Sequence, residues 1–258
     1  YKPDGMVTYN LPLLLSGSTM NTNVRTVHVA LDPDTLKTLN LERFGERRSE
    51  LYYQMLDQQY YTMPETVDIP AGEYVATLPI NFTLGGENNA NSLDMSDKYI
   101  LPLTIVDDPS YDYQSNDRLH YRKALLNVIP FNDYSGTYDA AQYRIFLKPD
   151  VKNPFTISSQ RAFVVDDRTI FIYAGTRDID YLDRKQYKVF IRFPEKGTDS
   201  KLLEVWSDNP EIELKLDEKK ACTFTMNEEM DELKPYLKKI YITLYLYYSF
   251  KDYTTVPG

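Results

Sequence analysis

Few side chains in this sequence have the types and spacing that catalysis requires. Cysteine occurs once, at Cys222, and the two histidines, His28 and His120, lie far from it and from each other along the chain. A nucleophilic cysteine needs a basic neighbour that lowers its pKa, and zinc needs clustered Cys and His ligands. We therefore expect Cys222 to be a small buried residue and both histidines to be structural or solvated. We expect no catalytic residue, no metal site and no cofactor.

Paired carboxylates are the remaining route to hydrolysis, because glycosidases use two carboxyl groups about 5–10 Å apart. With 38 acidic residues, pairs arise by chance. Residues 166–167 separate two strand-like runs, and the pairs at 107–108 and 208–209 precede proline, so all three read as turns. A calcium site in the acidic loop 107–117 stays open as an alternative, because carboxylates are ligands for that ion. The loop lacks the Asp-x-Asp-x-Asp-Gly spacing, which favours a solvated loop.

The aromatic residues offer binding chemistry instead. Trp206, the single tryptophan, ends an alternating run that places it on the face of Glu204, opposite Leu203 and Val205. Tryptophan is a flat apolar ring with a polar N–H, and sugars stack on such rings. The alternative is that the ring fills the interior of its domain. The candidate glycan-binding residues are Trp206, Asp208, Asn209, Tyr245 and Tyr247.

Tyrosine is abundant, with 23 copies, and it follows a strand pattern near the end of the chain. In residues 240–247, isoleucine and leucine occupy the even positions, while Tyr241, Tyr245 and Tyr247 share the odd ones. A strand directs successive side chains to opposite faces. The pattern predicts a sheet with one apolar and one aromatic, hydrogen-bonding face, and the tyrosines either form a binding surface or pack between strands.

Composition narrows the class of protein further. The chain has 258 residues, 42% hydrophobic and 26% charged, which is typical of one large or two ordinary globular domains. A net charge of −9 disfavours nucleic acid and anionic lipid surfaces as partners. No apolar run approaches the ~18 residues that span a bilayer. The single cysteine excludes an internal disulfide.

Short alternating segments with turn residues between them predict an all-β fold. Residues 24–31, 66–69, 74–82 and 99–106 are expected strands, and Asp32 followed by Pro33 predicts a capped helix start. The Pro, Gly and polar residues of 129–136 predict a domain boundary. We expect a β-sandwich at 1–131, then a barrel-like antiparallel domain or meander at 132–258.

Four segments of the first half form a recognisable series: Val29-x-Leu31-Asp32 with Leu36 and Leu39-Asn40, Tyr53-x-x-Leu56-x-x-x-Tyr60, Val67-x-Ile69-Pro70-Ala71-Gly72, and residues 98–103. On these segments, roughly residues 6–131 resemble the N-terminal immunoglobulin-like module of Bacteroidetes surface lipoproteins from glycan-utilisation loci. The entry to the second half, Phe131-x-x-Tyr134-x-Gly136-x-Tyr138, is similar to relatives with a lipocalin-like C-terminal barrel. The resemblance implies a protein in the position of the starch-utilisation-system E-type binding proteins, held at the outer membrane by a lipid anchor outside this stretch of sequence.

These observations predict non-catalytic binding of an extracellular polysaccharide or oligosaccharide at the cell surface, in support of an outer-membrane uptake complex. The alternative is a structural or adhesin-like module that binds protein and no glycan, and a hydrolase ranks last.

Overall fold

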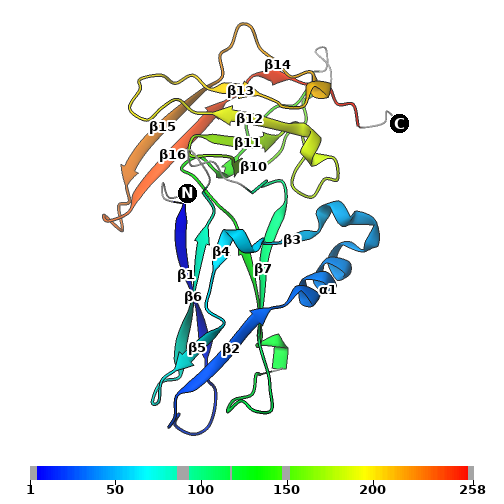
Figure 1. Cartoon of the computed structure of the whole chain (residues 1–258). Coiled ribbons are helices and arrows are strands. Elements are labelled where there is room, and N and C mark those ends of the chain that lie inside the picture. Colours follow the sequence, from blue (N-terminus) through cyan, green and yellow to red (C-terminus); the bar gives the residue numbers. More distant parts are fainter. Residues whose placement is uncertain (1–4, 86–92, 117, 147–151, 255–258) are drawn as a thin grey trace. The chain divides into compact units, whose positions relative to one another are not determined.

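The computed structural model describes residues 5–85, 93–116, 118–146 and 152–254. Strands dominate its regular structure, with one α-helix and short 3-10 helices, so the expected all-β class is confirmed. The chain divides into two compact units, one ending at Pro130 and one beginning at Phe131 (Figure 1). Each unit has sheets of its own.

The described residues of the N-terminal unit form two sheets. Its elements are β1 (Met6–Leu14), β2 (Arg25–Leu31), α1 (Pro33–Phe44), a 3-10 helix (Glu46–Leu51), β3 (Tyr53–Met55), a 3-10 helix (Gln58–Tyr60), β4 (Tyr61–Thr62), β5 (Thr66–Ile69), β6 (Val75–Thr83), β7 (Lys98–Ile105), a 3-10 helix (Arg118–His120) and β8 (Lys123–Val128). One sheet has the order β1-β6-β4, and the other has the order β3-β7-β2-β5, with β8 paired to β7. Among the strand pairs described in this unit, β3–β7 is the parallel one and the others are antiparallel.

Alternate residues of both sheets are buried, as the sequence pattern predicts. Leu78 and Ile80 of β6 are fully buried, and Val27 and Val29 of β2 are nearly so. Their intervening neighbours are more exposed. This period of two buries one face of each sheet in the interior of the unit.

Helix α1 begins as expected, at a capping aspartate followed by proline. The Asp32 carboxylate accepts hydrogen bonds from the Thr35 N–H (3.1 Å) and the Thr35 hydroxyl (2.6 Å), and Lys123 lies 2.8 Å from it. Burial disfavours the charged form, but the hydrogen bonds from Lys123 and Thr35 outweigh it and lower the pKa of Asp32. Among the described residues, no helix is both long and apolar enough to cross a bilayer.

We expect Asp32→Ala to lower the free energy of unfolding by about 1–2 kcal/mol, because the cap and the ion pair are both lost. Asp32→Asn keeps the cap and loses the charge, so it costs less. A carboxyl group with a lowered folded pKa stabilises the protein above its ordinary value of 3.8, and this contribution disappears as the pH falls through the folded pKa. Denaturant midpoints between pH 3 and 7 check this expectation. A loss of the same size with the exposed control Asp34→Asn would contradict it.

Three sheets are formed by the part of the C-terminal unit that the structure describes. Its elements are β9 (Gly136–Asp139), β10 (Ser159–Val164), β11 (Thr169–Tyr173), a 3-10 helix (Arg184–Tyr187), β12 (Lys188–Arg192), β13 (Glu204–Trp206), a 3-10 helix (Pro210–Ile212), β14 (Lys215–Leu216), β15 (Thr223–Met230), β16 (Lys238–Tyr245) and β17 (Tyr248–Ser249). The largest sheet has the order β13-β12-β11-β10-β9, and the others are the pairs β14–β17 and β15–β16.

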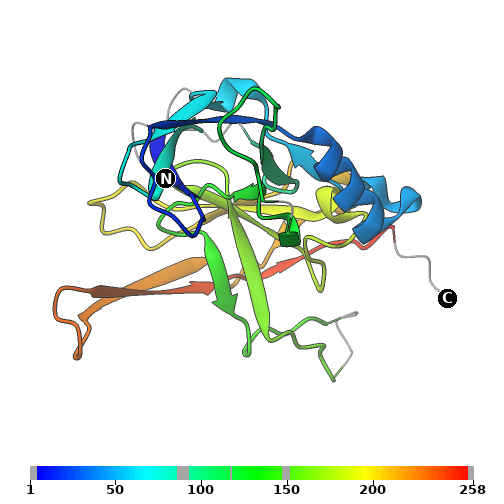
Figure 2. The same cartoon turned by 90° about the horizontal axis from the view of Figure 1, so that it is seen from below.

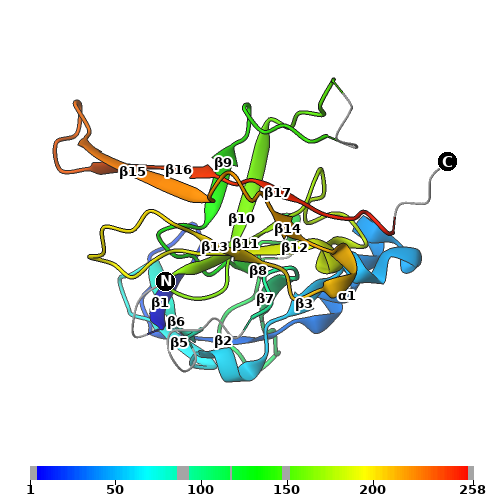
Figure 3. The same ribbon diagram turned by 90° about the horizontal axis from the view of Figure 1, so that it is seen from above.

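The core of this unit lies on one face of the five-stranded sheet. Ile172, Val189 and Ile191 are buried there, and the half-buried Ile242 and Leu244 of β16 pack against them. The expected two-faced strand near the end of the chain is therefore present, with its apolar face inward. β15 and β16 continue beyond the core as a ribbon that extends to one side of the sheet (Figures 2 and 3).

The closed lipocalin-like barrel expected for residues 132–258 is not found among the described residues. β9 and β13 are the two edges of the five-stranded sheet, and no described pairing joins them. The C-terminal strands instead form the separate pairs β14–β17 and β15–β16. Alternation in the sequence predicts which face of a strand is buried, and the strand partners depend on long-range register that alternation does not encode.

Candidate functional site

Trp206 lies at the end of β13, on the sheet face opposite the core. Leu203 and Val205 belong to the buried cluster, whereas Trp206 does not and is half-buried. The prediction that Trp206 lies on the strand face opposite Leu203 and Val205 is therefore confirmed. Trp206 pairs with Phe190 across β12 and β13, and their rings stack with centroids 5.4 Å apart and planes 16° apart.

Polar groups surround the Trp206 ring. Its indole Nε1–H donates a hydrogen bond to Asp208 (3.0 Å), and the Arg192 guanidinium carbon lies 5.0 Å from the ring centroid. Arg192 also donates to Glu204, at 3.3 Å. The arrangement is a half-exposed aromatic ring with the Arg192 guanidinium over it and the Asp208 carboxylate at its N–H, so its exposed part offers apolar ring surface beside groups that hydrogen-bond hydroxyl groups.

Trp206 ends a row of aromatic residues that crosses four strands. Phe163 pairs with Phe171, Phe171 with Phe190, and Phe190 with Trp206. Phe163 and Phe171 are buried, so the half-buried Phe190 and Trp206 form the accessible end of the row. Sequence reasoning missed this row, although each phenylalanine occupies an alternate position of a strand-like run.

Asp208 and Asn209 lie beside Trp206 in sequence, but their hydrogen bonds differ. Asp208 accepts from the indole N–H, as described above. The Asn209 amide donates to the Gln186 carbonyl (2.8 Å) and to the Tyr253 hydroxyl (2.9 Å), and its oxygen accepts from the Glu211 N–H (3.1 Å). Asn209 therefore caps the 3-10 helix at 210–212 and ties it to neighbouring loops, and these contacts use its donors and its acceptor.

Tyr245 and Tyr247 are not brought to Trp206 by any described contact. Tyr245 is 43% exposed and pairs with Thr223 on the ribbon. Tyr247 is half-buried, its backbone N–H lies 3.4 Å from the Cys222 sulfur, and Lys220 lies 4.9 Å from its ring centroid. The two tyrosines form a separate surface at the base of the ribbon.

The side chains considered for catalysis or metal binding make hydrogen bonds or ring contacts with other residues of the protein. Cys222 is buried and accepts the Tyr247 N–H just described. His28 stacks on Tyr111 with centroids 4.0 Å apart. In the acidic loop, Asp107 binds Ser115 and Arg122, and Asp108 binds Ser110. Within the described ranges no three Cys, His, Asp or Glu side chains form a group that could hold a metal ion.

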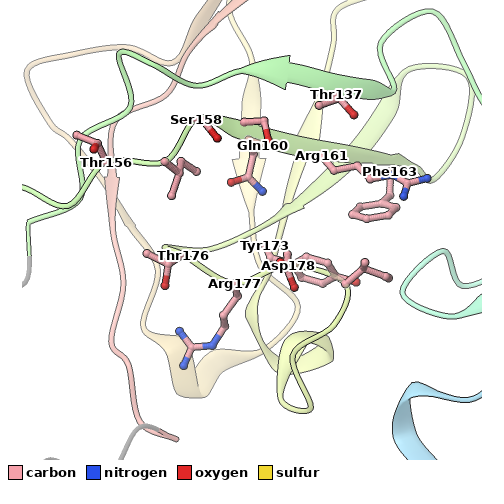
Figure 4. Close-up of a pocket in the computed structure, with 13 residues that line it drawn as sticks. Thr137, Thr156, Ser158, Gln160, Arg161, Phe163, Tyr173, Thr176, Arg177 and Asp178 are labelled. Carbon is pink, nitrogen blue, oxygen red and sulfur yellow. The ribbon is translucent and has the colours of Figure 1, made fainter. Parts of the chain in front are cut away.

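A groove of about 530 Å3 lies elsewhere in the C-terminal unit, between the first half of β10 and the segment that follows β11 (Figure 4). Its lining is mostly polar. Thr137 belongs to β9, Ser158 immediately precedes β10, Gln160 lies in β10, and Thr176 to Ile179 form the opposite wall. Sequence reasoning did not single out any of these residues.

The fold and these surfaces define a two-unit all-β protein whose accessible features are an aromatic plane and a polar groove. Family comparison agrees with the division along the chain. A family model described as a domain of unknown function, DUF4973, matches residues 1–109, and a model for a C-terminal domain matches residues 122–257. No curated protein matches the sequence.

Solved structures from Bacteroides match nearly the whole chain. A Bacteroides ovatus protein of unknown function is 42% identical, with 98% of this chain and 80% of that chain covered and a TM-score of 0.81. A Bacteroides thetaiotaomicron protein described as an auxiliary nutrient binding protein is 37% identical, with 98% and 79% covered and a TM-score of 0.81. This chain belongs to the same family as these Bacteroides proteins.

Proposed function

We propose that this chain binds an extracellular polysaccharide or oligosaccharide without converting it, at the cell surface and in support of an outer-membrane uptake complex. The half-exposed Trp206 ring, with Arg192 over it and Asp208 at its N–H, carries the proposal. Sugars combine apolar ring faces with many hydroxyl groups, so a sugar site combines aromatic planes with hydrogen-bonding groups. The description of the 37% identical relative as an auxiliary nutrient binding protein supports the same class of function.

We also propose that the N-terminal unit is an immunoglobulin-like module and that the C-terminal unit is related to lipocalin-like domains. The protein would then occupy the position of the starch-utilisation-system E-type binding proteins. Attachment to the outer membrane through a lipid anchor outside this stretch of sequence completes the proposal. The N-terminal unit, with its two sheets and buried inner faces, supports the immunoglobulin-like part.

A protein-interaction module is the second candidate, and one observation favours it. The far end of the β15–β16 ribbon exposes large apolar side chains, with Leu233 92% and Tyr236 79% exposed. Exposed apolar clusters of this kind mark binding sites for proteins. Capture of a protein partner by an intact chain that retains no glycan, with that capture lost in Leu233→Ser, would favour this second function.

We expect Trp206→Ala to abolish glycan retention in affinity gels while changing the melting temperature little, because Trp206 lies outside the core. Tyr236→Ala, which removes another exposed aromatic ring, is the matched control and retains binding. A large drop in the melting temperature of Trp206→Ala, or unchanged retention by the folded variant, would remove Trp206 from the site.

A further inference from the structure

We propose that the polar groove between β10 and the segment after β11 is a second saccharide site, which binds a short stretch of neutral oligosaccharide. The inference rests on the proposed function and assigns a place and a chemical class to the ligand. Four observations carry it: the way the strands separate, a half-buried amide without a partner, a set of unused hydroxyl groups, and balanced charge.

The groove exists because β10 leaves β11 partway along its length. β10 pairs with β11 at Phe163 and Val164, and it pairs with β9 from Ser159 to Ala162. Where β10 separates from β11, the Phe163 and Tyr173 rings lie 5.5 Å apart and both are buried. These packed aromatic rings form part of the groove lining. The groove volume of about 530 Å3 falls in the range of small-molecule sites.

Gln160 projects into this groove from β10 toward the segment that contains Thr176 and Asp178 (Figure 4). The residue is half-buried, and its amide makes no hydrogen bond with any described residue. The buried Asn132 of the same unit behaves differently, since its oxygen accepts from two backbone N–H groups and its nitrogen donates to two carbonyl oxygens. The Gln160 amide is accessible and supplies donors and an acceptor, so it is open to an external partner.

Five serine and threonine hydroxyl groups line the same groove, and none makes a side-chain hydrogen bond with a described residue; they belong to Thr137, Thr156, Ser158, Ser159 and Thr176. A hydroxyl donates once and accepts twice, and an amide supplies both donors and acceptors. Sugar hydroxyls have the same dual character. A ligand with several hydroxyl groups can therefore satisfy this wall, whereas an apolar ligand would leave it unsatisfied.

The charge of the lining favours a neutral ligand. The Arg177 guanidinium points away from Gln160 (Figure 4) and lies 3.0 Å from Asp183 and 2.9 Å from Asp252. The remaining charged residues, Arg161 and Asp178, are opposite in sign. Because no excess of positive charge remains, acidic saccharides gain no attraction in the groove.

The test begins with an array of neutral and acidic oligosaccharides probed with the intact chain, and the best neutral ligand is then titrated by calorimetry. Gln160→Ala is expected to weaken binding about tenfold, which corresponds to one or two lost hydrogen bonds. Ser158→Trp places a large ring in the groove and is expected to abolish binding. Gln142→Ala, at an exposed glutamine outside the lining, is the matched control and binds as the intact chain does. All three variants are expected to melt as the intact chain does.

The outcomes separate the groove from the Trp206 surface. Weaker binding by folded Gln160→Ala and Ser158→Trp supports the groove, with or without an effect of Trp206→Ala. Unchanged binding by both groove variants, with loss in Trp206→Ala, overturns the groove and leaves the proposed function standing. Array binding confined to acidic saccharides overturns the neutral class. No binding by the intact chain overturns the proposed function and the groove together.

Discussion

Replacing Arg177 with methionine is expected to lower the free energy of unfolding of the C-terminal unit by about 3–5 kcal/mol, the cost of breaking a buried ion pair. Arg177 is 7% exposed, its guanidinium lies 3.5 Å from the Tyr187 ring centroid, and it binds Asp183 and Asp252. Although burial opposes the charge, hydrogen bonds to Asp252 and Asp183 raise the pKa of Arg177. Methionine fills similar space but leaves both carboxylates without their cation.

The same network holds the end of the described chain. The Tyr187 hydroxyl donates to Asp252 (3.0 Å) and accepts the backbone N–H groups of Tyr253 and Thr254 (3.0 Å each). Loss of Arg177 is therefore expected to release residues 252–254 before the unit unfolds, which faster amide exchange at these positions would report.

Trp206 is the only tryptophan, so its fluorescence follows unfolding of this unit in denaturant. Arg168→Met is the matched control, because Arg168 forms a longer pair with the exposed Glu195, at 3.6 Å. Such a pair contributes less than about 1 kcal/mol. Equal midpoints for the Arg177 and Arg168 variants would show that the buried network does not stabilise the unit.

The second large effect is expected at Phe193. This side chain is 1% exposed, stacks on Tyr134 with centroids 3.7 Å apart, and meets the Phe224 ring edge-on at 5.1 Å. Phe193→Ala leaves a cavity where the turn before β9, the end of β12 and β15 converge. We expect a loss of about 3–5 kcal/mol, the range for phenylalanine truncations in cores.

Thermal and denaturant unfolding of Phe193→Leu and Phe155→Ala provide the comparison. Leucine fills part of the cavity and is expected to lose less stability than alanine. Phe155 is 54% exposed, so its truncation is expected to change stability little. A Phe193→Ala variant as stable as Phe155→Ala would place the core of the unit elsewhere.

Local signals predicted much of the fold. The start of α1 was predictable because Asp32 and Pro33 act on adjacent backbone groups. The buried face of β16 was predictable because alternation alone determines which side chains share a face. The end of α1 at Phe44 has a local signal that sequence reasoning missed: Gly45, with a φ of 68°, caps the helix, and its N–H donates to the Leu41 carbonyl.

Long-range contacts limited the prediction of the site. The orientation of Trp206 was predictable because Trp206 follows the buried Val205 in a strand and therefore points to the other face. The role of Asn209 was not, because its amide binds groups at Gln186 and Tyr253, far away in sequence. In the sequence, Gln160 is an ordinary strand residue. Its place in a groove depends on where β10 stops pairing with β11. Arg177 likewise gives no local sign of burial. Separation of strands and burial of isolated polar residues arise only when distant segments meet.

Titration of the intact chain with the oligosaccharides selected by the array tests the central claim, which is that this protein binds glycan without converting it. We expect saturable calorimetric binding and recovery of the oligosaccharide unchanged in length after prolonged incubation. Absence of binding across the array would contradict the binding claim. Release of reducing ends by pure protein, lost on replacing one carboxylate, would contradict the non-catalytic claim.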